Sequence, residues 1–117
     1  LESKCAADIG LIFSEIGGEK QICFDDNKDI IKLSIENGVN TEITGLMVNV
    51  IGTERAESFS LDDADVSKAG VYLTDLGYNI DGNGEIRQVK IIPLITPFDE
   101  EVVCTEQALV AESLRAC

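Results

Sequence analysis

The sequence predicts an all-β protein, an antiparallel β-sandwich of about seven strands. Hydrophobic residues make up 44% of the chain while aromatic residues reach only 5%, so the core must be built mainly from Ile, Val and Leu, which favours strands. Short apolar stretches recur between turn signals, without a convincing long helix. The 117 residues are enough for one hydrophobic core, so residues 1–117 are predicted to form a single domain.

Two strands are predicted near the N-terminus. The range Asp8–Ile16 is dense in Ile, Leu and Phe and ends at Gly17-Gly18, which indicates a strand and a turn. Lys20–Phe24 follows as a short second strand. The polar cluster Asp25–Lys28 then favours another turn.

The third predicted strand has the clearest alternation, because Ile31, Leu33 and Ile35 share one face and polar residues occupy the other. Asn37-Gly38 supplies a turn, and Ile43–Ile51 is the next strand. We expect these two strands to form the centre of one sheet. The predicted core collects inward positions of the alternating strands: Ile31, Leu33, Ile35, Leu46, Val48, Val50, Val89 and Ile91.

The second half of the chain continues in short strands. Glu57–Leu61 alternates, with Phe59 and Leu61 inward, and the acidic stretch Asp62–Asp65 marks a loop or one helical turn. Val71–Ile80 and Glu85–Ile95 are two further strands. They are separated by Asp81-Gly82-Asn83-Gly84, which predicts a hairpin.

Two features near the C-terminus modify this pattern. Pro93 and Pro97 predict that the strand Glu85–Ile95 runs along a sheet edge or ends in a bend. The tail Thr105–Ala116 has two interpretations, a helix capped by Thr105 or a last strand.

Six to eight short strands with regular turn signals are typical of a sandwich of immunoglobulin-like character. The immunoglobulin fold proper adds a Trp and a fixed cysteine pair that links the two sheets. This chain has no Trp. The predicted likeness is therefore one of architecture.

The four cysteines, Cys5, Cys23, Cys104 and Cys117, predict two disulfides and therefore an oxidising compartment. The chain has no His and no C-x-x-C pair, which argues against a zinc or haem site and leaves buried reduced thiols as the alternative. Three pairings are possible. The local pairs, Cys5 with Cys23 and Cys104 with Cys117, would each close a loop of roughly 15 to 20 residues and stabilise the fold by about 3 kcal/mol.

Charge and residue types exclude several classes of function. The formal net charge of -13 repels a phosphate backbone, so we expect no nucleic acid partner. No His and no G-x-S-x-G turn is present, and acidic clusters such as Asp25-Asp26 lie in turn-like, solvated stretches. We therefore expect no enzymatic activity and no cofactor.

One segment is weakly similar to a calcium-binding loop. Its possible oxygen ligands are Asn79, Asp81, Asn83 and Glu85, with Gly84 at the turn. The twelfth position, where such loops carry a bidentate Glu, is Lys90, and the flanking segments are predicted strands. A plain hairpin turn without metal is the favoured interpretation.

The segment IIKLSIENGVNTEITGLMVNVIG resembles extracellular immunoglobulin-like domains of archaeal surface proteins, among them pilin-like subunits and archaellum accessory domains. The resemblance extends to IRQVKIIPLI and to the cysteines at positions 104 and 117. It implies an extracellular or cell-surface structural module, a subunit of a surface filament or pilus-like assembly whose partners are copies of itself. The alternative is a monomeric adhesion or ligand-binding domain of a cell-envelope protein.

Archaeal pilins carry a long hydrophobic N-terminal helix, and this sequence instead starts with the polar segment Leu1–Cys5. We therefore expect membrane contact only through a segment outside this chain. Assembly without such a helix would proceed through another contact, such as strand addition at an open sheet edge.

Overall fold

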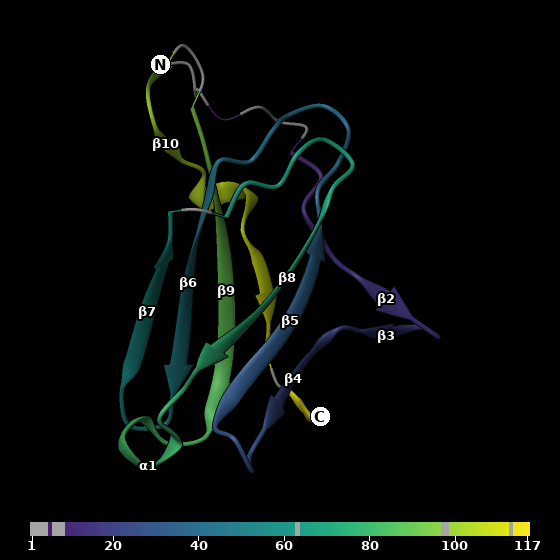
Figure 1. Cartoon of the computed structure of the whole chain (residues 1–117). Coiled ribbons are helices and arrows are strands. Elements are labelled where there is room, and N and C mark those ends of the chain that lie inside the picture. Colours follow the sequence, from purple (N-terminus) through teal and green to yellow (C-terminus); the bar gives the residue numbers. More distant parts are fainter. Residues whose placement is uncertain (1–4, 6–8, 63, 97–98, 113) are drawn as a thin grey trace.

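The computed structural model describes Cys5 and residues 9–62, 64–96, 99–112 and 114–117. These residues form twelve strands, one short α-helix and one 3-10 turn, and the strands build mainly antiparallel sheets (Figure 1). The predicted all-β class is confirmed. The predicted number of about seven strands is too low, because several extended segments are interrupted and divide into short strands.

The first sheet is centred on β5 (Ile30–Glu36). On one side β8 (Val71–Gly77) pairs with it along its whole length. On the other side of β5, β1 (Ile12–Phe13) pairs with its C-terminal end and β4 (Ile22–Asp25) pairs with its N-terminal part. The C-terminal strand β12 (Arg115–Ala116) adds to β4 in parallel.

The second sheet is centred on β6 (Gly45–Gly52) and β9 (Ile86–Ile95). β7 (Ala56–Leu61) forms its edge beside β6. The other side of β9 is shared by β10 (Val102–Val103) and β11 (Leu109–Ala111). Both sheets contribute side chains to one hydrophobic core.

A small hairpin projects from the first sheet between β1 and β4 (Figure 1). It consists of β2 (Glu15–Ile16) and β3 (Glu19–Lys20), joined by Gly17 and Gly18 at φ values of 61° and 83°. The predicted Gly17-Gly18 turn is confirmed, because only glycine adopts these angles readily. The predicted single strand over 8–16 is wrong in its described part, since the chain leaves β5 after β1.

The two alternating strands expected to pair in one sheet, β5 and β6, lie in different sheets. The intervening Asn37 is buried, and its Nδ2 donates to the carbonyl oxygens of Thr41, Val66 and Ser67. These bonds satisfy the backbone of a connection that crosses from one sheet to the other. Asn37-Gly38 is therefore part of a crossover and not of a hairpin.

The predicted hairpin over 71–95 is also wrong, because β8 pairs with β5 whereas β9 pairs with β6. The segment between them contains the short helix α1 (Ile80–Asn83), whose N-cap Asn79 accepts a hydrogen bond from the Gly82 N–H. The preceding Tyr78 is fully buried and draws the chain into the core. This burial turns the chain from one sheet to the other.

Pro93 lies inside the second sheet, not at the predicted edge. The Cys104 N–H donates to the Pro93 carbonyl oxygen, and a regular ladder would require residue 93 to donate in return. Proline has no N–H to donate. Instead the Cys104 carbonyl accepts from Gln107, where the neighbouring strand gives way to the 3-10 turn η2 (Thr105–Gln107). Pro97 lies outside the described residues.

The C-terminal tail follows the strand interpretation and does not form the predicted helix capped by Thr105, because η2 spans only three residues and its N-cap is Cys104, without a side-chain cap hydrogen bond. It begins with the single turn η2 and continues as the strands β11 and β12. The predicted core is confirmed, since all of its members are buried. The sequence prediction missed further buried side chains, among them Ile43, Val66 and Tyr78.

Candidate functional site

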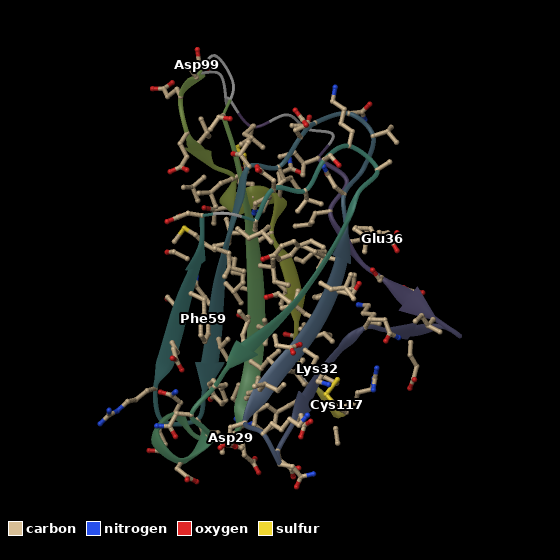
Figure 2. All side chains as sticks on the ribbon, viewed as in Figure 1. Asp29, Lys32, Glu36, Phe59, Asp99 and Cys117 are labelled. Atoms are coloured by element: carbon tan, nitrogen blue, oxygen red, sulfur yellow. A yellow bond between two sulfur atoms is a disulfide. The ribbon has the colours of Figure 1, made fainter. Side chains whose placement is uncertain are left out.

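The four cysteines form two disulfides, Cys5–Cys104 and Cys23–Cys117. The prediction of two disulfides is confirmed, but neither local pair forms. Both bonds are long-range, with sequence separations of 99 and 94. The reason is topological: β12 returns to lie beside β4, which places Cys117 next to Cys23 and close to Lys32 (Figure 2).

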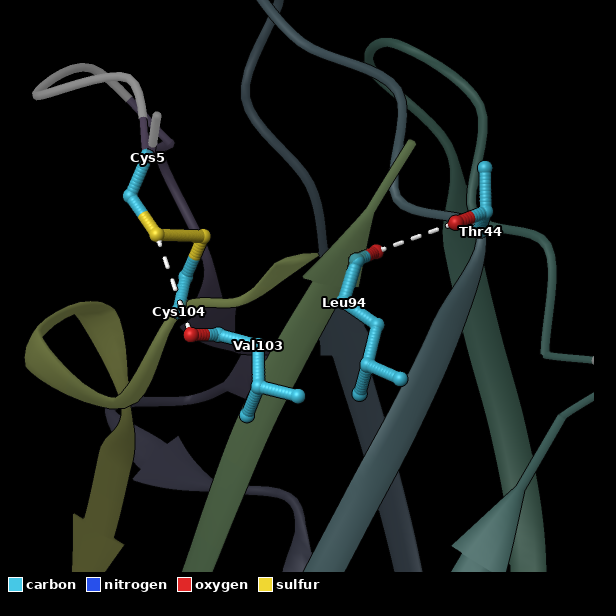
Figure 3. Close-up of a disulfide and its surroundings, with 5 residues drawn as sticks. All are labelled: Cys5, Thr44, Leu94, Val103 and Cys104. Carbon is cyan, nitrogen blue, oxygen red and sulfur yellow. Dashed lines mark hydrogen bonds between the residues drawn. A yellow bond between two sulfur atoms is a disulfide. The ribbon is translucent and has the colours of Figure 1, made fainter. Parts of the chain in front are cut away.

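The two bonds tie both ends of the described chain to the sheets. Cys104 is completely buried after β10, and its bond to Cys5 fixes Cys5 beside the second sheet (Figure 3). Closing a loop of this length stabilises a fold by about 4 to 5 kcal/mol in the chain-entropy model. Disulfides of this kind persist in oxidising, non-cytoplasmic compartments.

The residues of the weak calcium candidate lie on and around α1. Asn79 Oδ1 caps the helix, and Asn83 Nδ2 donates to Glu57 Oε1 at 2.9 Å. The Asn83 carbonyl accepts from Glu54 and Arg55, so this segment docks onto the β6–β7 turn. Asp81 lies in the first helical turn, and the Glu85 carbonyl accepts from Thr53. In the described ranges no group of three or more His, Cys, Asp or Glu side chains is placed to hold a metal ion.

Tyr78 is a buried titratable side chain that directly follows β8. Burial raises the pKa of its hydroxyl, and the Glu57 carboxylate raises it further. The hydroxyl donates to the Gly84 carbonyl at 2.6 Å, and the ring contacts Phe24 edge to face at 6.0 Å between centroids. These contacts give Tyr78 a structural role at the junction of the sheets.

β8 is an edge strand of the first sheet, and its side facing away from β5 is the candidate interaction surface. Two bonds flank the β5–β8 ladder, from Asn37 N–H to the Gly70 carbonyl and from Tyr78 N–H to the Asp29 carbonyl. Because narrow and wide pairs alternate in an antiparallel ladder, these bonds determine which β8 residues bond to β5. They are the even-numbered ones, so the backbone N–H and C=O groups of Val71, Leu73 and Asp75 point away from β5.

No strand within the described ranges pairs with this side of β8. The same odd-numbered residues turn their side chains to the outer face of the sheet, where Val71 is 56% and Leu73 is 71% exposed. Asp75 lies opposite Lys32 on β5, so its carboxylate has a cationic neighbour on that face. The β8 edge therefore offers free backbone groups beside exposed apolar side chains.

The β7 edge of the second sheet differs in chemistry. The Gly52 N–H donates to the Arg55 carbonyl, so the odd-numbered residues of β7 are the ones that bond to β6. The backbone groups of Ala56, Ser58 and Ser60 therefore point away from β6. Their side chains are small or polar and exposed, while Phe59 packs against the core beside β6 (Figure 2). Exposed apolar side chains thus distinguish the β8 edge from the β7 edge.

A groove of about 660 Å³ lies between the β2–β3 hairpin and the C-terminal strands. Ile22, Val110 and Leu114 give it apolar walls. Glu19 and Arg115 place both signs of charge on its lining. Its chemistry suits a small amphipathic ligand or an extended peptide.

The sequence analysis did not identify Val71 and Leu73 as site residues. In the run VYLTDLG, apolar residues occupy both faces of the strand, so alternation does not reveal the buried face. A strand buried on both faces has the same pattern, so the sequence carries no signal that identifies the exposed apolar face.

Comparison with protein-family models, curated proteins and solved structures finds no match. Within the part of the chain that the structure describes, no helix is long and apolar enough to cross a membrane.

Proposed function

We propose that this protein is a non-enzymatic extracellular structural module, a subunit of a surface filament or pilus-like assembly that binds copies of itself. The observation that carries this proposal is the open β8 edge with its exposed Val71 and Leu73. Natural proteins usually protect such edges with Lys, Pro or bulges, because free strand edges pair readily with other chains. An unprotected apolar edge is therefore suited to assembly.

Two further features support an extracellular structural role. Disulfides that anchor both ends of the chain resist local unfolding outside the cell. Two mainly antiparallel sheets around a common core support an immunoglobulin-like sandwich of the type found in archaeal surface proteins. An open sheet presents unpaired backbone groups along its edge strands, and these groups can pair with another chain.

The acidic surface sets the conditions for assembly. Each copy carries a formal charge of -13, so copies repel one another at low ionic strength. At about 1 M salt the Debye length falls to about 3 Å, and this repulsion is screened. We therefore expect association to strengthen as salt concentration rises.

Sedimentation velocity across protein and salt concentrations, followed by electron microscopy, tests this function. The expected result is concentration-dependent association at high salt and ordered fibres in which this chain repeats. A chain that remains monomeric at high concentration in both low and high salt contradicts the proposal.

The groove beside the β2–β3 hairpin favours a second candidate, a monomeric ligand-binding domain of the cell envelope. The two functions make opposite predictions for Leu114→Asp, which places a charge in the groove. Ligand capture by a monomer would be lost in this variant, whereas assembly through the β8 edge would persist.

A further inference from the structure

We propose that two copies of this chain pair antiparallel through their β8 edges, with a two-fold axis at Leu73, so that the first sheets of both copies join into one continuous sheet. This inference rests on the proposed self-assembly and names the surface and the register. β8 is seven residues long and offers a free donor and a free acceptor at every second residue.

The partner of such an edge must be an extended strand, because only a strand presents donors and acceptors at the same spacing. An antiparallel copy of β8 meets this requirement. With the axis at Leu73, that residue pairs with its own copy, and Val71 pairs with Asp75 of the other copy. All free backbone groups of these three residues then find partners.

The side chains favour this register. The two Leu73 side chains stand directly opposite each other on the outer face, and each Val71 lies diagonally beside the other copy's Leu73, so the exposed apolar side chains form one patch. Within its own chain Leu73 lies opposite the uncharged Ser34, whereas Val71 at the end of the patch lies opposite Glu36.

Charges exclude a register centred on Asp75. That register would set two carboxylates directly opposite each other, which is unfavourable in an acidic chain. With the axis at Leu73 the two Asp75 residues are offset by four positions along the strands, roughly 13 Å apart. Each keeps Lys32 of its own chain as a neighbour, and the separation exceeds the Debye length of about 8 Å at physiological salt.

A two-fold contact closes on itself and produces a dimer. A fibre therefore needs a second contact between these dimers. The β8 contact forms first, so dimers should be the smallest species to form as concentration rises.

Matched lysine variants identify the edge. Leu73→Lys places like charges opposite each other in the dimer, while Ser60→Lys makes the same change at the β7 edge. Both add one positive charge to an acidic chain, so a general charge effect would strengthen association in both. We expect Leu73→Lys to raise the dimer dissociation constant by roughly tenfold or more, and Ser60→Lys to leave it no weaker. The opposite pattern overturns the inference.

Cysteine variants test the register in the full chain, with peptide mapping to verify that the native disulfides are intact. Opposed residues in a narrow antiparallel pair have Cα atoms about 5.5 Å apart, within reach of a disulfide. Leu73→Cys should therefore form a covalent dimer on oxidation, and Asp75→Cys should not. A mixture of Val71→Cys and Asp75→Cys should form the mixed dimer.

The outcomes separate the two proposals. Cross-linking through Asp75→Cys alone overturns the register. Association that persists in Leu73→Lys without cross-linking at Leu73→Cys overturns the β8 contact but leaves the self-assembling function intact. A wild-type chain that stays monomeric under all salt conditions overturns both.

Discussion

The Tyr78 hydroxyl donates a hydrogen bond to the Gly84 carbonyl oxygen across the short helix that joins the two sheets. The bond measures 2.6 Å, and Tyr78 itself is fully buried. The tyrosine thereby holds the crossover from β8 to β9 in place. Its removal tests how much this junction contributes to stability.

Tyr78→Phe should lower the free energy of unfolding by about 1 to 3 kcal/mol, because the Gly84 carbonyl loses its donor in a partly buried site. Urea unfolding followed by circular dichroism measures the change. Tyr72→Phe is the matched control, since Tyr72 is only partly buried and should change little. Equal effects of the two substitutions would contradict the structural role of Tyr78.

The same tyrosine predicts a loss of stability at alkaline pH. Its pKa in the folded protein is raised above the ordinary value of 10.0, chiefly by burial. Above pH 10 the unfolded chain releases this proton while the folded chain retains it, so folding becomes less favourable as pH rises toward the folded pKa. Stability measured from pH 9 upward should fall less steeply in Tyr78→Phe than in the wild type.

Gly52→Ala should destabilise the fold strongly, whereas Gly77→Ala should not. A Cβ at position 52 would clash with the Asn83 carbonyl oxygen and the Tyr78 hydroxyl, while a Cβ at position 77 meets no atom within 4 Å among the described residues. Overpacking of this kind typically costs about 1 to 3 kcal/mol. Thermal unfolding of both variants compares them directly, and similar melting temperatures would be inconsistent with the close packing of α1 on β6.

The two disulfides should differ in their contribution to stability. Their sequence separations of 99 and 94 give nearly equal loop entropies, so a difference must come from the surroundings of the sulfur atoms. Cys104 is fully buried, whereas Cys117 is exposed. The double variant Cys5→Ala, Cys104→Ala should therefore lose more stability than Cys23→Ala, Cys117→Ala, which leaves a smaller cavity.

Urea unfolding of both double variants measures this difference. Peptide mapping of the wild type without reductant provides the control and should recover only the Cys5–Cys104 and Cys23–Cys117 cross-links. Recovery of Cys5–Cys23 would contradict the topology.

The positions of most strands and the inward residues of the core follow from local patterns. Ile31, Leu33 and Ile35 alternate with polar residues, and this period of two identifies a buried face whatever strand lies beside it. The same pattern does not identify the neighbouring strand. For that reason β5 and β6 were predicted to share a sheet, and the structure places them in two.

The candidate site required the tertiary structure for a similar reason. Val71 and Leu73 become site residues because β8 has β5 on one side and no described strand on the other. Whether a strand lies at an edge depends on hydrogen bonds to residues far away in the chain. The sequence of β8 therefore does not indicate which of its two sides is paired.

By itself the sequence determined the all-β class, the core-facing positions and the formation of two disulfides. Composition and the even cysteine count do not depend on which segments meet, and alternation is a property of each strand alone. The tertiary structure decided the pairing of Cys23 with Cys117, the crossover at Asn37 and the open edge of β8. Each of these depends on contacts between segments distant in sequence, whose formation is governed by the packing of the whole chain.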